Sequence, residues 1–473
     1  MVDGRALTAQ FEDAADFETR KVLCGGQLLT VLFLDGLTSG GDIAEQVVRP
    51  LAQMTDEARE EVLYTRALQG GVWCASVKEP ESTQQAAELL VNGFCVILFP
   101  KSGKALGCEV KTGEKRSPSP PETENTVKGA KDAFTETLRT NTSLVRRHLR
   151  TPGLRLTETV IGKRTLTKVT VCWIDRLTDP ELPRRMQERL SSIDIDGALS
   201  PAAIEEYVTG SRRTAFPLLE YTERTDHFCQ GLLDGQVGLL VDGLPLGYLA
   251  PVGLGRLMRS PEDRATDFLS ASMLRLLRYA ALGVSLLLPA LYAAMAMFHQ
   301  QMLPTKLLLS IIESKQNVPF STLLEVLGLL CAFELLQQAG LHLPQAVGTA
   351  VSIIGGLVVG TAAVDAKLVS PAALIVTASS GICGFTLPNR ELSDAVRLWR
   401  FVLTVLTGLW GLFGVSVGLL LLLTELAGLE SLGRSYLSPF GRAEVKGALV
   451  RPRLVRQKWR DGALKPMDDQ NQR

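Results

Sequence analysis

The sequence YAALGVSLLLPALYAAMAMF, residues 279–298, is the clearest indication of the fold class of this chain. Its 20 residues include no charged side chain. The hydrocarbon core of a bilayer is about 30 Å thick and is crossed by roughly 20 apolar residues of α-helix, so this stretch predicts a membrane-spanning helix. Three later stretches have the same apolar character and predict further spans, at residues 346–364, 369–388 and 401–423. The C-terminal region is therefore predicted to be a polytopic α-helical membrane domain.

Residues 1–270 differ in character, because charged side chains are spread throughout them. The whole-chain values of 21% charged residues, a net charge of +0 and a mean hydropathy of +0.15 average the two regions. Residues 11–20 (FEDAADFETR) are acidic, and no apolar core of signal-peptide length follows them. We expect this front region to be soluble and to stay in the cytoplasm.

Local patterns divide the front region into two small α/β subdomains, giving an α+β region overall. Residues 83–92 have helical periodicity and precede a strand-like run, FCVILF, at 94–99. Later, residues 130–150 predict a helix, and residues 166–174 and 237–249 predict strands. The resulting boundaries are 1–114 for the first α/β subdomain, 115–127 for a linker rich in Pro and Ser, 128–270 for a second α+β subdomain, 271–430 for the transmembrane domain and 431–473 for a basic tail.

The residues that usually carry catalysis or bind metals are scattered. The chain has eight cysteines without a Cys-x-x-Cys pair and four histidines without metal-ligand spacing. No phosphate-binding loop, dinucleotide fingerprint, nucleophile elbow or metalloprotease helix occurs. Asp194 and Asp196 could hold a divalent cation, but a strand end turning at Gly197 explains them better because further oxygen ligands are missing. We therefore expect no enzyme activity, no catalytic residue, no metal and no cofactor.

The predicted helix at 130–150 carries several basic side chains, among them Arg139, Arg146 and Arg147. A basic helix can bind nucleic acid, but a solvated helix face is the commoner explanation. In a domain tethered to a membrane, contact with a neighbouring subunit or with lipid headgroups is the next alternative. We expect no nucleic-acid partner.

Two acidic residues, Glu325 and Glu334, lie in the otherwise apolar segment 318–338. At about 100° per residue, nine positions rotate them by about 900°, so they project from opposite sides of a helix. A charge in hydrocarbon costs at least about 2.5 kcal/mol, so each carboxylate needs water, a proton or a partner. These are the membrane acids that we single out as functional candidates. The alternative is that the helix lies at the membrane interface or re-enters the membrane, with its acids wet or paired to neighbouring subunits.

Small residues recur at helical spacing on two of the predicted spans. Such stripes let helix backbones approach closely, so helix packing is their expected role. We therefore expect a tightly packed bundle that forms a homo-oligomer in membrane lipid. The residues concerned are Gly348, Ser352, Gly356 and Gly360 on one span and Gly408, Gly411, Gly414 and Gly418 on the last.

Basic residues beside the predicted spans give conflicting directions for the topology. Arg275 and Arg278 precede the first span and a run of basic residues follows the last, so both ends favour the cytoplasmic side. Arg390, Arg397 and Arg400 favour the same side. No simple arrangement of four or five spans places all three groups there. The predicted number of membrane helices stays between four and six.

Several short motifs occur along the chain, and their order is more specific than any one of them. In the front region they are Ile193-Asp194-Ile195-Asp196-Gly197, Thr222-Glu223-Arg224 with Asp226, Asp234-Gly235 and Val241-Asp242-Gly243-Leu244-Pro245. In the apolar region they are Pro289-Ala290-Leu291-Tyr292, Phe333-Glu334-Leu335-Leu336, IIGGLVVG at 353–360 and SLGRSYLSP at 431–439. This order, from Asp35 to Pro439, resembles the A subunits of GerA-type spore germination receptors. Thr225 and Gln337-Gln338 depart from the family pattern.

The resemblance implies a membrane subunit of a nutrient germinant receptor, integral to the spore inner membrane, with its N-terminal domain on the cytoplasmic, spore-core side. It implies a transporter-like B subunit and a lipoprotein C subunit as partners. The A subunit would convert nutrient sensing into ion release and germination, as an oligomeric channel or signalling element. The alternative function is that of a paralogous spore membrane protein that releases ions or dipicolinate, or amplifies the signal, without sensing nutrients.

Overall fold

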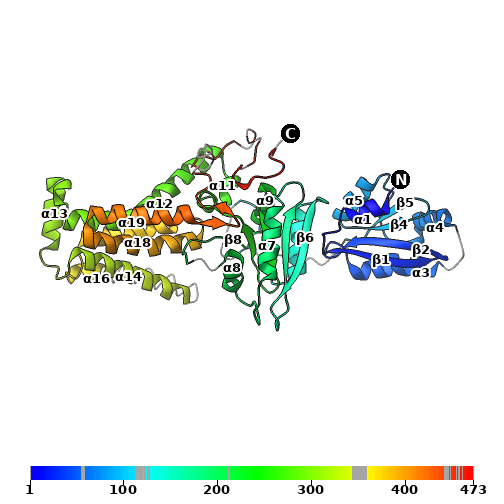
Figure 1. The fold of residues 1–473 in the computed structure, drawn as a ribbon, viewed down its shortest axis with the longest axis horizontal. Coiled ribbons are helices and arrows are strands. Elements are labelled where there is room, and N and C mark those ends of the chain that lie inside the picture. The colour runs from blue at the N-terminus through cyan, green and yellow to red at the C-terminus, as the bar shows by residue number, and fades with distance from the viewer. Residues whose placement is uncertain are drawn as a thin grey trace.

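The computed structural model describes residues 2–54, 59–111, 121, 124, 128–210, 213–342, 360–440, 447, 449–453, 455, 457, 459–460 and 462–471. The molecule is elongated, with two α/β units and a bundle of helices in a row (Figure 1). The N-terminus belongs to the unit at one end, and helix α13 (Thr305–Lys315) lies at the far end of the bundle. The predicted order, an α/β front region followed by a helical region, is confirmed.

The first α/β unit is a five-stranded antiparallel sheet covered on both faces. Its strand order is β1 (Phe17–Cys24), β2 (Gln27–Leu34), β4 (Phe94–Phe99), β5 (Lys104–Glu109) and β3 (Val77–Lys78). Every residue of β4 is buried, because Cys95 and Ile97 pack against one layer of helices while Val96 and Leu98 pack against the other. One layer holds α1 (Gly4–Ala9) and α5 (Thr83–Val91), and the other holds η1 (Ile43–Val48), α3 (Arg49–Gln53), α4 (Glu60–Arg66) and η2 (Ala67–Gly71), preceded by α2 (Gly40–Asp42).

The second α/β unit repeats this architecture. Its antiparallel sheet has the order β6 (Leu154–Ile161), β7 (Thr167–Ile174), β9 (Val237–Val241), β10 (Gly247–Ala250) and β8 (Glu220–Thr222). Helices α7 (Glu181–Ser191) and α8 (Pro201–Thr209) cover one face, and α6 (Leu138–His148) and α9 (Thr225–Asp234) cover the other. The helix predicted at 130–150 begins only at Leu138, because the residues before it run beside β8, where Phe134 N donates to Glu223 O at 2.8 Å.

A buried ion pair joins the two α/β units. Arg146 of α6 donates from Nε and Nη2 to the two carboxylate oxygens of Asp16, at 2.6 and 2.7 Å. The exposed fractions of the two side chains are 1% and 2%. Beside this pair, Ala15 N donates to Leu156 O at 2.8 Å. The solvated basic face predicted for this helix is therefore wrong at Arg146, because the adjacent unit covers it.

Two short helices, α10 (Leu254–Leu257) and α11 (Glu262–Ala265), lead from the second unit into the bundle. The bundle consists of α12 (Phe268–Met297), η3 (Gln300–Met302), α13, α14 (Thr322–His342), α16 (Gly360–Asp365), α17 (Pro371–Phe385), α18 (Arg390–Trp410) and α19 (Leu412–Gly428), and is followed by β11 (Glu430–Ser431), β12 (Arg434–Ser435) and η6 (Gly462–Leu464). Among the described helices, α12 and α14 are long and apolar enough to cross a membrane, whereas α17 and α19 are apolar but shorter. The predicted span at 346–364 and the linker at 115–127 lie largely outside the described residues.

The single span predicted at 401–423 is wrong. Helix α18 ends at Trp410 and α19 begins at Leu412, with Gly411 between them at a φ of +60°. The two helices fold back on each other, since Leu403 of α18 lies against Gly418 of α19. The left-handed backbone at Gly411 reverses the chain, and glycine adopts it without the clash that a Cβ would cause.

This reversal removes the conflict between the basic groups. Helices α12 and α18 run away from the second α/β unit, while α14, α17 and α19 run toward it (Figure 1). Arg278, Arg390 and Arg434 consequently lie at the same end of the bundle, next to the α/β units. Splitting one predicted span into two helices changes whether the predicted number of spans is odd or even. The sequence prediction treated 401–423 as one span, and for this reason it could not place the three groups on one side.

Candidate functional site

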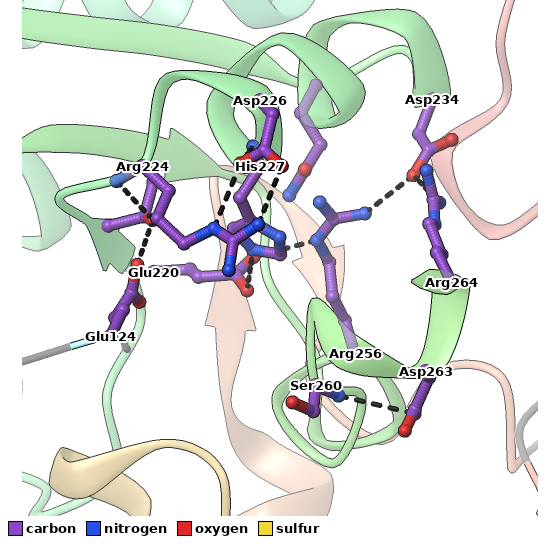
Figure 2. A network of polar contacts seen from close by, with 12 residues as sticks. Glu124, Glu220, Arg224, Asp226, His227, Asp234, Arg256, Ser260, Asp263 and Arg264 are labelled. Atoms are coloured by element: carbon purple, nitrogen blue, oxygen red, sulfur yellow. Dashed lines mark hydrogen bonds and ion pairs between the residues drawn. The ribbon is translucent and has the colours of Figure 1, made fainter. Parts of the chain in front are cut away.

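A network of ion pairs lies where the second α/β unit meets the bundle (Figure 2). At its centre, the Glu220 carboxylate on β8 accepts from Arg256 Nε at 2.7 Å and is paired with His227 Nε2 at 2.9 Å. The other side of Arg256 donates from Nη1 to Asp234 at 3.0 Å, and Arg264 Nη2 donates to the same carboxylate oxygen at 3.0 Å. The network thus joins β8 and both ends of α9 to α10 and α11.

Burial and charge together set the acid–base properties of this network. Burial alone would raise the pKa of Glu220, but the charges of Arg256 and His227 outweigh it and lower this pKa to about 2. Burial would likewise raise the pKa of Asp234, and the charges of Arg264 and Arg256 lower it on balance. Both carboxylates are therefore ionised at neutral pH, and their contacts are charge-assisted hydrogen bonds.

A second group of charges connects this network to the first helix of the bundle. Asp263 in α11 pairs with Arg275 at 3.2 Å and with Arg278 at 2.8 Å, and both arginines lie on the first turns of α12. The next residue after Asp263 is Arg264, which pairs with Asp234. A displacement of β8 or α9 would therefore disturb α12 through a short chain of ion pairs.

Several residues of this site belong to the motifs of the sequence. Arg224 donates from Nε and Nη2 to Asp226 at 2.9 and 2.6 Å, at the start of α9, and Asp234 ends the same helix. The motifs did not indicate Glu220 or Arg256, although these two complete the network. Arg256 is 36 positions from Glu220 and 22 from Asp234, so no local pattern connects them.

Glu334 lies within the bundle, on α14. Its two carboxylate oxygens accept from Arg397 at 2.9 Å and from Arg400 at 3.1 Å. Arg400 is 1% exposed and Glu334 is 24% exposed. Arg400 also donates to Ser380 on α17 at 3.1 Å, and Arg397 donates to Gln337, one of the positions that depart from the family pattern. The site therefore joins α14, α17 and α18.

Glu325 lies at the far end of the bundle. Its carboxylate accepts from Ser370 N, at the N-terminus of α17, and lies 3.6 Å from Lys315 Nζ. A carboxylate at a helix N-terminus is stabilised by the unpaired N–H groups and by the helix dipole. Among the residues that the structure describes, Glu325 and Glu334 contact different partners, and the opposite directions expected for them stay a prediction.

The predicted packing residues of the first stripe are only partly described. Gly348, Ser352 and Gly356 lie outside the described residues. Gly360 begins α16 and makes ordinary contact, since a Cβ there would lie 3.7 Å from Leu374. A role of this stripe in packing stays a prediction.

The second stripe is divided between two helices. Three of its residues lie at close contacts between helices: Gly408, Gly414 and Gly418. A Cβ at Gly408 would overlap Leu323 of α14, and one at Gly414 would overlap the backbone carbonyl of Leu406 on α18. Gly411 lies in the turn between α18 and α19 and not on a helix face, and a Cβ there would lie 3.0 Å from Phe298, just after α12.

A cavity of about 840 Å³ lies between the second α/β unit and the bundle. Helix α8, the loop before β8 and the first turns of α18 line it. Glu205, Glu391 and Asp394 contribute carboxylates, and Phe216 contributes an apolar wall. Arg213 also lines it, so charged side chains of both signs surround this cavity.

The acidic pair Asp194 and Asp196 lies at the surface of the second unit. Asp194 pairs with Lys163 at 2.5 Å, and Asp196 pairs with Arg164 at 3.3 Å. Each carboxylate thus has a basic neighbour from the loop between β6 and β7. In the part of the chain that the structure describes, no three His, Cys, Asp or Glu side chains gather as a metal site requires.

Comparisons with known proteins agree along nearly the whole chain. The family described as Bacillus/Clostridium GerA spore germination protein matches residues 5–466. The chain is 36% identical over 450 residues to the uncharacterized membrane protein YfkQ of Bacillus subtilis (strain 168), covering 94% of this chain and 87% of that protein. It is 34% identical over 448 residues to spore germination protein KA of the same organism, covering 93% and 81%, and 30% identical over 451 residues to its spore germination protein B1, covering 94% and 93%.

Among solved structures, the chain is similar to the crystal structure of the N-terminal domain of the A subunit of the Bacillus megaterium spore germinant receptor GerK3. The sequence identity is 23% and the TM-score is 0.41, covering 52% of this chain and 92% of that domain. The family model and these relatives match the residues that form the two α/β units, the ion-pair network and the bundle. The chain therefore belongs to the GerA family of spore germination proteins.

Proposed function

We propose that the protein is a membrane subunit of a spore germinant receptor, in which it converts nutrient sensing into ion release and so starts germination. It acts as an oligomer in the spore inner membrane, with its α/β units on the core side, beside a transporter-like B subunit and a lipoprotein C subunit. Relatives named spore germination proteins, matched over more than nine tenths of this chain, support the germination role. We propose no catalytic role.

One observation in the bundle carries the ion-release part of the proposal. Arg400 is buried among apolar helices, yet it is held by single hydrogen bonds to Glu334 and Ser380, each at 3.1 Å. Its Nε has no partner among the described residues. A buried charge that is incompletely satisfied is costly, so a rearrangement that supplies water or a further partner is favoured. Helices α14, α17 and α18, which meet at Arg400, are the ones that we expect to move when an ion path opens.

The ion-pair network at the base of the bundle supports the coupling part of the proposal. It links β8 and α9 to Asp263, and Asp263 to Arg275 and Arg278 on α12. Farther along α12, the Ser285 carbonyl accepts from Ser380 Oγ at 2.7 Å. Since Ser380 is also a partner of Arg400, a tilt of α12 would alter the contacts of the buried arginine.

Ion flux across liposomes tests the proposal. The chain would be reconstituted with its B and C subunits, and conductance recorded with amino acids, nucleosides or other nutrients. We expect a nutrient-dependent current that Arg400→Gln reduces at least tenfold, whereas Glu313→Gln, at an exposed position of α13, leaves it unchanged. A current that ignores nutrients would favour the paralogue without sensing. Silence of the assembled complex under all conditions would overturn the channel role.

A further inference from the structure

Three of the eight cysteines gather in the first α/β unit, next to the edge strand β3 of its sheet. Cys95 on β4 and Cys108 on β5 are directly opposite each other in the antiparallel pair. On the other side of β5, Cys108 is opposite Val77, the first residue of β3. Cys74 lies three residues before Val77. The fold of the sheet therefore brings Cys95 and Cys74 to Cys108 from its two sides.

The loop that carries Cys74, residues 72–76, is held on both sides of this cysteine by backbone hydrogen bonds. Trp73 N donates to a backbone carbonyl of η1 at 2.9 Å. Ser76 O accepts from the backbone N–H of Glu109, the last residue of β5, at 2.9 Å. The first bond fixes the loop to a helical layer and the second fixes it to the sheet. Between them, Cys74 packs against the core of the unit.

The three thiols differ in their access to solvent. Cys95 and Cys108 are 0% exposed. Cys74 is half-buried, and its two neighbours in the chain, Trp73 and Ala75, are exposed. A small oxidant dissolved in water therefore reaches Cys74 before it reaches the other two.

A hydrogen bond between side chains connects Cys108 to Cys74. This bond lowers the pKa of Cys74, against the opposing effects of burial and of the charge of Asp42. The same bond, together with burial, raises the pKa of Cys108, so Cys108 keeps its proton and is the donor. The thiolate is the reactive form of cysteine, and an accessible thiolate beside a second thiol is typical of redox-sensing pairs.

We propose that Cys74 and Cys108 form a reversible disulfide when the protein meets a peroxide. The Cys74 thiolate attacks one oxygen of hydrogen peroxide and the O–O bond breaks. The sulfur becomes a sulfenic acid, and the other oxygen leaves as hydroxide, which takes up a proton to give water. The sulfur of Cys108 then attacks the sulfur of Cys74, and the sulfenic hydroxyl leaves as water with the proton of Cys108. The two thiols lose two electrons, and one peroxide is reduced to two waters.

The disulfide joins the loop 72–76 covalently to β5. It also protects Cys74, because a sulfenic acid without a second thiol beside it is oxidised further to the sulfinic acid, which ordinary thiols do not reduce. In a reducing compartment such a bond is transient, as redox-sensing disulfides commonly are. This inference rests on the first α/β unit alone and goes beyond the function proposed above.

Peptide mass spectrometry of the full-length chain in mild detergent tests the bond. The reduced chain would be treated with hydrogen peroxide, its remaining thiols blocked with an alkylating reagent, and the product cleaved with trypsin. Cleavage after lysine and arginine places the three cysteines in separate peptides, 67–78, 79–101 and 105–111. A disulfide between Cys74 and Cys108 is therefore detected as 67–78 joined to 105–111.

We expect this joined species in most of the unmodified chain after peroxide treatment, and its loss on addition of dithiothreitol. Cys108→Ala should leave Cys74 as a sulfenic acid that dimedone captures. It should also slow the oxidation of Cys74 several-fold, because the hydrogen bond that favours the thiolate is lost. Cys95→Ala is the matched control, since it removes the other buried thiol of the same strand pair and should leave the joined species unchanged.

Circular dichroism would establish that each variant is folded. If Cys108→Ala does not fold, Cys74→Ser, at the half-buried position, replaces it, and Cys108 should then stay reduced in the folded chain. Three results would overturn the proposal: peptide 79–101 joined to 105–111, a Cys74 that stays reduced under peroxide, or equally rapid formation of sulfinic acid at Cys74 with and without Cys108. None of these results bears on nutrient-dependent conductance, which the liposome measurement tests separately.

Discussion

Arg146 and Arg400 are the most deeply buried of the described arginines, each 1% exposed, and they are held in different ways. Arg146, between the two α/β units, donates to both oxygens of Asp16 at 2.6 and 2.7 Å, and its partner is 2% exposed. Arg400, inside the bundle, makes a single 3.1 Å contact with Glu334, which is 24% exposed and is shared with Arg397. Both residues are cations in low-dielectric surroundings, so the difference lies in their partners.

We describe the Arg146–Asp16 pair as the fixed joint and the Arg400–Glu334 pair as the movable joint. A bidentate pair with matched geometry offsets the desolvation of both charges, and no alternative arrangement improves on it. A shared, partly wet carboxylate offsets less, and small helix movements can exchange its partners. The front of the molecule is therefore expected to transmit movement as a rigid body, and the bundle to change conformation.

The largest effect on stability is expected from a substitution that removes the fixed joint. Asp16→Ala leaves the buried Arg146 without its counter-charge and should destabilise the chain by about 3–5 kcal/mol. Chemical unfolding of the full chain in mild detergent, followed by circular dichroism, measures this. Asp35→Ala removes one of the two acidic partners of Arg139, in a partly exposed pair, and should cost less than about 1 kcal/mol. Equal effects of the two substitutions would contradict the fixed joint.

The next effect concerns the network at the base of the bundle and depends on pH. The pKa of Glu220 is lowered from 4.5 to about 2 in the folded chain, so its stabilising contribution is complete above about pH 4.5 and is lost as pH falls toward 2. Glu220→Gln should therefore lower stability at pH 7 by on the order of 3 kcal/mol. The difference in unfolding free energy between the unmodified chain and Glu220→Gln should become smaller as the pH falls from 4.5 to 2.

Unfolding curves of the unmodified chain and of Glu220→Gln over this pH range measure this difference in free energy. Glu12→Gln, at an exposed acid of the first unit, serves as the control. Its unfolding free energy should change with pH in the same way as that of the unmodified chain. A difference in unfolding free energy that stays constant down to pH 2 would show that the charge of Glu220 contributes nothing to stability.

A smaller effect tests the movable joint. Glu334→Gln removes the carboxylate shared by Arg397 and Arg400, and hydrogen bonds to charged groups contribute about 1.5–3 kcal/mol. Since Arg400 keeps Ser380, the loss of stability should be below that of Asp16→Ala, while nutrient-dependent conductance should change at least tenfold. Thermal unfolding and liposome currents on the same preparations measure both. A large loss of stability with unchanged conductance would mean that the bundle pair is as fixed as the front pair.

The smallest expected effect concerns the hairpin of α18 and α19. Gly414→Ala brings a methyl group against the Leu406 carbonyl and should cost about 1–3 kcal/mol through forced separation of the helices. Gly428→Ala, on the same helix with open space around it, should be neutral or slightly stabilising. The thermal midpoints of the two variants in detergent measure the difference. Identical midpoints would contradict close packing at Gly414.

Local patterns predicted the elements that depend only on local forces. The helix at 83–92, the strand at 94–99 and the apolar helix that covers 279–297 were found from periodicity and length. The motif residues Arg224, Asp226 and Asp234 did fall in the ion-pair network. Glu220 and Arg256 were missed, because an isolated charge in a sequence gives no sign of a partner 36 positions away.

The charged α/β front, the apolar helical end and the motifs of the GerA family can be recognised without coordinates, because composition, periodicity and motif order are properties of neighbouring residues. The break in residues 401–423 and the burial of Arg146 and Arg400 depend on contacts between distant parts of the chain. Gly411 can continue a helix or reverse it, and contact with a neighbouring helix selects between the two. The state of a buried charge likewise depends on which distant residue folding brings to it.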